Sequence, residues 1–184
     1  LSILLCLLFS LTLPPGMDRW LMSAALAFTL LSDTFLLVLN RSYLTGVALF
    51  CVVQLLYLAR ILLAAEGALR LPLVLVRRAA LAAAVCVLLQ VLNTLTPLNA
   101  LSGIYFTQLL ANGAESLTLR PRGRRYVLFS AGLFLFIGCD ICVGLYNLIP
   151  ASPAGGFARV GMWLFYLPSQ VLLTLSARSW AKRM

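Results

Sequence analysis

The chain has 184 residues, of which 62% are hydrophobic and 10% are charged. Soluble domains usually carry about 25% charged residues, so a water-soluble globular fold is excluded. Fourteen basic residues against five acidic ones give a net charge of +9, and these charges lie between apolar runs, so we expect membrane lipids and not nucleic acid as partners. The sequence contains no histidine, which excludes Ser-His-Asp triads, His-ligated zinc hydrolases and HExxH metalloproteases.

Apolar segments follow one another along the whole chain, separated by proline, glycine and charged residues. A run of about 20 such residues crosses roughly 30 Å of hydrocarbon at ~1.5 Å per residue. The pattern predicts an all-α polytopic transmembrane helix bundle in one domain over residues 1–184. Its segments are expected at about 1–13, 17–39, 43–64, 75–94, 98–118, 126–149 and 157–178.

The first segment is short for a span, so we expect it to be the remnant of a longer helix. A further span before Leu1 would place both termini in the cytoplasm. The five cysteines all fall inside apolar segments, where they are expected to act as small packing residues. Cys139 and Cys142 form a CxxC, but on a continuous helix this pair is a poor disulfide and only half a metal site. We therefore expect no metal and no cofactor.

The basic residues divide unequally if the segments alternate in direction. Twelve fall on one side, and Arg41 and Arg159 fall on the other. Because basic loops remain in the cytoplasm, we expect a cytoplasmic C-terminus, and the compact loops are typical of a bacterial inner membrane protein. The twelve residues are Arg19, Arg60, Arg70, Arg77, Arg78, Arg120, Arg122, Arg124, Arg125, Arg178, Lys182 and Arg183.

Asp33 and Asp140 are the only acidic residues deep within segments. A charge at a helix centre costs roughly 2.5–3.5 kcal/mol on the insertion scale, so both are functional candidates. Asp33 lies about 13 residues past Trp20 and Asp140 about 14 past Tyr126, which places both roughly 20 Å from the inner boundary. Because burial disfavours the charged form and no basic residue lies at this depth, we expect two nearby carboxyls to share one proton.

Polar residues at helical spacing accompany the aspartates in three other segments. Spacings of three and four residues place such side chains on one helical face, which predicts a shared polar cavity. The alternative is simple hydrogen bonding between helices, worth only about 0.6 kcal/mol per pair on average. The candidate substrate-binding residues are Gln54 and Tyr57 in the third segment, Tyr105, Gln108, Asn112 and Glu115 in the fifth, and Tyr166 and Gln170 in the seventh.

Three stretches of the sequence resemble the YhhN lysoplasmalogenase family. They are LSDTFLLVLNRSYLTGVALFCVVQLLYLARI (31–61), FSAGLFLFIGCD (129–140) and WLFYLPSQVLLTLSA (163–177). The resemblance implies a hydrolase, usually of eight spans, that cleaves the vinyl-ether bond of lysoplasmalogens. Its products are a fatty aldehyde and a glycerophosphoethanolamine or glycerophosphocholine, and its catalytic residues would be Asp33 and Asp140. The chain departs from the family pattern at Ser32 (usually Gly), Cys139 (usually Ser) and Gln54 (frequently His).

A pair of aspartates suits this chemistry. Vinyl-ether hydrolysis needs one carboxylic acid to protonate the alkene carbon and a nearby carboxylate to assist the attack of water, and two carboxyls in different protonation states provide both. We expect the alkenyl chain to lie among apolar helix faces, with the headgroup toward the cytoplasm. Glu115 would then meet a cationic headgroup nitrogen and the basic run at 120–125 the phosphate, unless this run only fixes the topology.

Two other classes also place carboxyls inside a membrane. An intramembrane aspartyl protease is disfavoured, because Gly138 and Cys139 precede Asp140 where that class has Gly-x-Gly, and Leu167-Pro168 lacks the context of a Pro-Ala-Leu motif. A proton-coupled transporter or a lipid-binding membrane protein remains the alternative, since membrane carboxyls also serve as proton relays. The paired broken helices typical of many transporters are not evident in the sequence.

Overall fold

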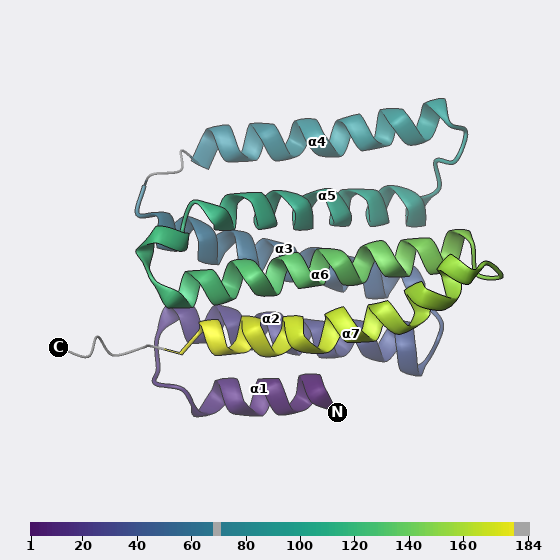
Figure 1. The fold of residues 1–184 in the computed structure, drawn as a ribbon. Coiled ribbons are helices and arrows are strands. Elements are labelled where there is room, and N and C mark those ends of the chain that lie inside the picture. The colour runs from purple at the N-terminus through teal and green to yellow at the C-terminus, as the bar shows by residue number, and fades with distance from the viewer. Residues whose placement is uncertain (68–70, 179–184) are drawn as a thin grey trace.

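A computed structural model describes residues 1–67 and 71–178, which form an all-α bundle (Figure 1). Within these ranges there are seven α-helices and two short helical turns, and no strand. The predicted fold class is therefore confirmed. The elements are α1 (Ser2–Thr12), α2 (Met17–Asp33), η1 (Thr34–Val38), α3 (Tyr43–Ala65), α4 (Leu71–Val91), α5 (Pro97–Leu117), η2 (Arg120–Arg122), α6 (Arg124–Leu148) and α7 (Pro153–Ser176).

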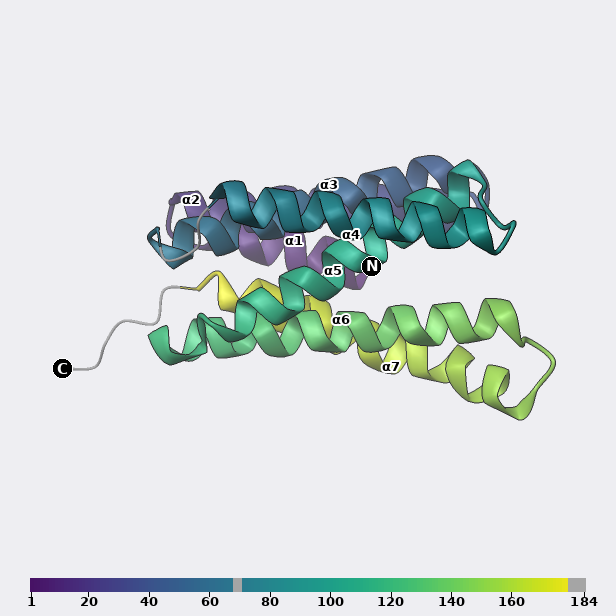
Figure 2. The ribbon, with the colours of Figure 1, turned by 90° about the horizontal axis from the view of Figure 1, so that it is seen from above.

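Successive helices run in opposite directions (Figure 1). Seen from above, α2, α3 and α4 project onto one layer and α6 and α7 onto another, while α5 crosses obliquely between them (Figure 2). The pairs α6 with α7, α2 with α3, and α3 with α5 make the most extensive contacts, whereas α4 packs mainly against α5. The bundle therefore has a core built by α2, α3, α5, α6 and α7, and α4 lies at its periphery.

Four helical stretches among the described residues are long and apolar enough to cross a membrane: Met17–Val38, Tyr43–Ala65, Leu71–Val91 and Arg124–Leu148. Helix α1 is apolar but shorter. Helices α5 and α7 have 21 and 24 residues, which is sufficient length, but polar side chains such as Gln108, Asn112 and Gln170 lower their hydropathy. The chain therefore has the helices of a membrane protein, and the two most polar of the long ones, α5 and α7, carry six of the ten predicted site residues.

The arginines of the described chain gather at one end of the bundle, where α2, α4 and α6 begin and α3, α5 and α7 end. Only Arg41 and Arg159 lie at the other end, as alternating directions predict. Arg70, Lys182 and Arg183, which were assigned to the same side, lie outside the described residues. The charge asymmetry thus holds in three dimensions for the described part of the chain.

Two helices begin four residues earlier than predicted, and in both cases the reason is a proline. Helix α4 begins at Leu71, not at residue 75, and α7 begins at Pro153, not at 157. Proline lacks an amide hydrogen, but the first turn of a helix does not need one, so proline starts a helix as readily as it breaks one. Ser152 completes the start of α7, because its hydroxyl oxygen accepts a hydrogen bond from the Gly155 amide at 3.0 Å.

Helices α6 and α7 approach each other closely at Gly132. A Cβ added there would lie 2.8 Å from Leu173 Cγ and 3.1 Å from the Leu173 backbone nitrogen, whereas one added at Gly144, on the same helix, would meet nothing within 4 Å. Contacts near 3 Å with backbone force the helices apart, and such overpacking typically costs about 1–3 kcal/mol.

We therefore expect Gly132→Ala to lower the free energy of unfolding by about 1–3 kcal/mol relative to Gly144→Ala. Both changes add the same methyl group to α6 and gain the same helix propensity, so the difference isolates the contact with α7. Denaturant titration of both variants in detergent micelles measures it. Equal unfolding free energies for the two variants would mean that the close contact at Gly132 does not constrain the bundle.

Candidate active site

Asp33 and Asp140 each accept a hydrogen bond from a tyrosine on another helix. The Tyr166 hydroxyl of α7 donates to Asp33 Oδ2 at 2.7 Å, and the Tyr105 hydroxyl of α5 donates to Asp140 Oδ2 at 2.5 Å. Both aspartates are half-buried. These two Asp–Tyr pairs join α2 to α7 and α6 to α5.

The two aspartates occupy equivalent positions on parallel helices. Helix α2 begins at Met17 and α6 at Arg124, at the same end of the bundle (Figure 1), and each aspartate is the seventeenth residue of its helix. At ~1.5 Å per residue both lie roughly 24 Å along the helix. The Asp–Tyr pairs therefore share one level of the bundle.

A row of aromatic rings connects the two pairs. The centroids of Tyr105 and Phe50 are 5.5 Å apart, those of Phe50 and Phe136 are 5.8 Å apart, and those of Phe136 and Tyr166 are also 5.8 Å apart. Phe136 lies one turn before Asp140 on α6, which places that carboxyl at the edge of the row. These four aromatic rings form a continuous row from one Asp–Tyr pair to the other.

The two carboxyls are held separately. Among the described residues no hydrogen bond joins Asp33 to Asp140, and none of the ion pairs there includes either residue. The arrangement is therefore that of two carboxyls flanking a common region, each with its own tyrosine donor.

The backbone changes conformation immediately after Asp33. Residues Thr34–Val38 form a π-helical turn, in which the Leu39 amide donates to the Thr34 carbonyl at 2.8 Å. Just before it, the Ser32 hydroxyl donates to the Gly46 carbonyl of α3 at 2.6 Å and ties α2 to its neighbour. The apolar pattern predicts only an uninterrupted helix here. Such π turns frequently occur at functional sites, where they redirect a side chain.

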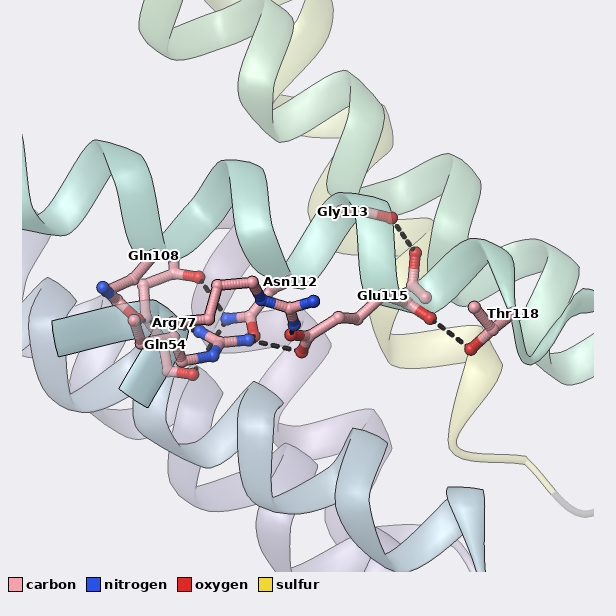
Figure 3. A network of polar contacts seen from close by, with 9 residues as sticks. Gln54, Arg77, Gln108, Asn112, Gly113, Glu115 and Thr118 are labelled. Carbon is pink, nitrogen blue, oxygen red and sulfur yellow. Dashed lines mark hydrogen bonds and ion pairs between the residues drawn. The ribbon is translucent and has the colours of Figure 1, made fainter. Parts of the chain in front are cut away.

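A second polar network, shown in Figure 3, joins the first turns of α4 to the last turns of α5, closer to the arginine-rich end. The Arg78 guanidinium donates to Gln108 Oε1 at 2.8 Å, to Asn112 Oδ1 at 2.7 Å and to Glu115 Oε2 at 2.5 Å. The Asn112 amide in turn donates to the backbone and side-chain oxygens of Gln54, both at 2.9 Å. Arg77 also forms an ion pair with Glu115. The network joins α3, α4 and α5.

The structure thus divides the predicted site residues into three groups. Asp33, Asp140, Tyr105 and Tyr166 form the Asp–Tyr pairs. Tyr57 and Gln170 are buried in the core, where the Tyr57 hydroxyl and Gln170 Oε1 lack a hydrogen-bond partner among the described residues. The remaining predicted residues belong to the arginine network and are Gln54, Gln108, Asn112 and Glu115.

Sequence reasoning assigned Arg77 and Arg78 to the charge bias alone and missed their contacts. The signal that could have found them is the hairpin geometry. In an antiparallel pair, the second turn of α4 lies beside the last turns of α5, where Glu115 is located. A buried carboxylate and an arginine at matching depth on adjacent helices are expected to pair, because either charge left alone there is costly.

A third cluster ties the helices together at the same end. Arg60 of α3 is buried and donates from Nε to Asp18 Oδ1 at 2.6 Å and from Nη2 to Asp18 Oδ2 at 2.9 Å. The same guanidinium donates to the Ser176 hydroxyl and carbonyl of α7, and it stacks on the Phe129 ring of α6 at 4.5 Å. One side chain therefore connects four helices, including α2, α6 and α7, which carry three of the four residues of the Asp–Tyr pairs.

Comparison with known proteins gives one match. A family model described as the YhhN family matches residues 1–177, nearly the whole chain. No curated protein and no solved structure matches it. Because the match covers all seven helices and both aspartates, the chain belongs to the YhhN family.

Proposed function

We propose that this protein is a membrane-embedded, lysoplasmalogenase-like hydrolase that cleaves the vinyl-ether bond of a lysophospholipid. The single observation that supports the proposal best is the pair of half-buried aspartates at one level of the bundle, each bound by a tyrosine. Family membership supports the same class of activity. The expected products are a fatty aldehyde and glycerophosphoethanolamine or glycerophosphocholine.

The reaction needs one protonated and one ionised carboxyl. The acid transfers its proton to the alkene carbon that is not bonded to oxygen, which leaves an oxocarbenium ion next to the ether oxygen. Water attacks this cation and gives a proton to the second carboxylate. In the resulting hemiacetal the hydroxyl proton returns to the first aspartate while the glyceryl oxygen leaves with the proton held by the second. Both carboxyls end as they began, and the parallel with glycoside hydrolysis is close.

Separate tyrosine donors suit this division of roles. Two carboxyls in direct contact would share a proton and leave no room between them, whereas inverting glycosidases keep theirs apart so that water fits. Here Asp33 and Asp140 each accept a hydrogen bond from their own tyrosine. The hydroxyl stabilises the ionised form of whichever carboxyl acts as base, and the aromatic row beneath offers an apolar surface for the double bond.

The substrate would enter from the lipid with its alkenyl chain among the apolar helix faces. In this proposal the arginine-rich end and the C-terminus face the cytoplasm, in a bacterial inner membrane, and the headgroup points the same way. Tyr57 and Gln170, whose buried Tyr57 hydroxyl and Gln170 Oε1 lack a partner among the described residues, would serve as further contacts to the substrate. Glu115 already carries two arginine partners, so its proposed part is to fix α4 and α5 with Gln108 and Asn112.

Isotope labelling tests the proposal directly. Purified protein supplied with a lysoplasmalogen in D₂O is expected to release an aldehyde with one deuterium at carbon 2, because the proton from the carboxylic acid ends on that carbon. The aldehyde is trapped as it forms and analysed by mass spectrometry. The matched substrate with a saturated ether bond is expected to yield no aldehyde. Aldehyde without deuterium, or equal cleavage of the saturated ether, would contradict the mechanism.

A further inference from the structure

A hollow of about 430 Å³ lies between α4 and α5, on the outside of the bundle. This volume falls in the range of about 300–1,000 Å³ that ligand sites occupy. Leu81 and Leu110 on its walls are 38% and 42% exposed, so the hollow opens sideways toward the lipid. We call it the α4–α5 groove, and its lining residues are Arg77, Leu81, Thr107, Leu110, Ala111, Ala114, Glu115 and Thr118.

The α4–α5 groove is separate from the Asp–Tyr pairs. On a helix with 3.6 residues per turn, Thr107, Ala111 and Ala114 lie on the face of α5 opposite to Tyr105. Tyr105 points to Asp140 on α6, whereas the groove is bounded by α4. A ligand in the groove would therefore contact neither aspartate.

One end of the groove carries a positive charge without a matching negative one. The single carboxylate of Glu115 pairs with two guanidiniums. Arg78 is 6% exposed and is the buried partner, since Gln108 and Asn112 also accept its hydrogen bonds. The Arg77 side chain is 51% exposed and forms the groove wall. Arg77 and Glu115 are the only charged residues in the lining, and together with Arg78, which shares the Glu115 carboxylate, their charges sum to +1.

We propose that the α4–α5 groove binds an anionic phospholipid of the surrounding leaflet. Its phosphate would contact the exposed face of the Arg77 guanidinium, and one acyl chain would lie along Leu81, Leu110, Ala111 and Ala114. Arginine is well suited to a phosphate because its planar donors match two phosphate oxygens. The position favours a bilayer lipid, because α4 is the peripheral helix and only 11% of its apolar window is buried inside the protein.

The net charge decides between lipid headgroups. A zwitterionic headgroup carries its own cation, which would lie close to Arg77 and Arg78 and be repelled, whereas an anionic headgroup leaves the phosphate uncompensated. One basic residue near a membrane surface contributes about 1 kcal/mol to such attraction, which corresponds to about a fivefold preference. The site is therefore predicted to select phosphatidylglycerol over phosphatidylcholine by about this factor.

A fluorescence reporter beside the groove tests the proposal. All three native tryptophans are replaced by phenylalanine, and Leu117, which is 39% exposed and adjacent to Thr118, is replaced by tryptophan. The full chain is reconstituted in vesicles that contain brominated phosphatidylglycerol or brominated phosphatidylcholine, and quenching is measured as their ratio varies. We expect about fivefold stronger apparent binding of phosphatidylglycerol.

Three variants locate the binding. Arg77→Gln should abolish the preference, and Arg77→Lys should retain part of it because the charge remains. Ala114→Phe should reduce quenching by both lipids because it fills the groove. Arg159→Gln removes the same charge at the other end of the bundle and should change nothing.

The proposal fails if native protein shows no preference, or if Arg77→Gln leaves it unchanged in protein with native circular dichroism. Cross-linking of α4 between two chains, with no lipid preference, would instead identify a second copy as the occupant. None of these readouts uses the hydrolytic reaction.

Discussion

Replacing either Asp33 or Asp140 by asparagine is expected to lower kcat/KM for a lysoplasmalogen by roughly 10²–10⁴, the usual contribution of general acid or base catalysis. Asparagine keeps the size of aspartate and an oxygen that accepts the tyrosine hydrogen bond, so the Asp–Tyr contacts at 2.7 and 2.5 Å can persist. What is lost is the ability to give or take a proton. Aldehyde release by each purified variant measures the effect.

The tyrosines and one remote acid provide the controls for this experiment. Tyr105→Phe and Tyr166→Phe should each reduce turnover by roughly 10- to 150-fold, because a hydrogen bond to a charged group contributes about 1.5–3 kcal/mol and the carboxyl itself retains its proton chemistry. Glu66→Gln removes a carboxylate that is 82% exposed and should leave turnover unchanged. If the folded double variant Asp33→Asn with Asp140→Asn turned over substrate at the native rate, the aspartates would have no part in the reaction.

The second large effect concerns stability. Arg60→Met should lower the free energy of unfolding by about 2–3 kcal/mol, because it leaves the Asp18 carboxylate and the Ser176 carbonyl without their guanidinium. Breaking a fully buried ion pair typically costs about 3–5 kcal/mol, and the effect here is smaller because Asp18 is 32% exposed. Unfolding in mixed micelles at increasing denaturant concentration measures the change.

A double variant separates the ion pair from the packing of the side chain. Asp18→Asn with Arg60→Met should be more stable than Arg60→Met alone, since the stranded charge is then removed. Arg60→Lys should lie between native and Arg60→Met, because an ammonium cannot donate to both Asp18 oxygens and Ser176 in the same planar geometry. Additive losses in the double variant would show that Asp18 and Arg60 are not energetically coupled.

The sequence by itself determined the fold class and the positions of the two aspartates along their helices. Apolar runs of sufficient length can satisfy their backbone hydrogen bonds in a membrane only as helices or closed barrels, so composition and length predict the helices. The positions of Asp33 and Asp140 follow from counting residues, because the helical rise is constant. The unequal distribution of arginines likewise requires only that successive helices alternate in direction.

The residue patterns that predict helices place the helix ends less accurately than the helices themselves. The sequence pattern places Pro72 and Pro153 between predicted apolar segments, but both lie in the first turn of a helix, where a proline is tolerated. The π turn after Asp33 was not predicted, since its hydrogen bonds depend on how α2 meets α3, as in the contact between Ser32 and the Gly46 carbonyl. Residue spacing alone contains no information about that contact.

Only the tertiary structure decided which polar residues are partners. Spacing places Tyr105, Gln108, Asn112 and Glu115 along α5, but it does not say which neighbouring helix each one meets. Because α5 packs against α6, Tyr105 forms a hydrogen bond with Asp140. Because α5 also packs against α4, Glu115 forms ion pairs with Arg77 and Arg78. A helical pattern fixes the direction of a side chain relative to its own axis, whereas hydrogen bonds and ion pairs depend on the positions of other axes, which are set by the packing of the whole bundle.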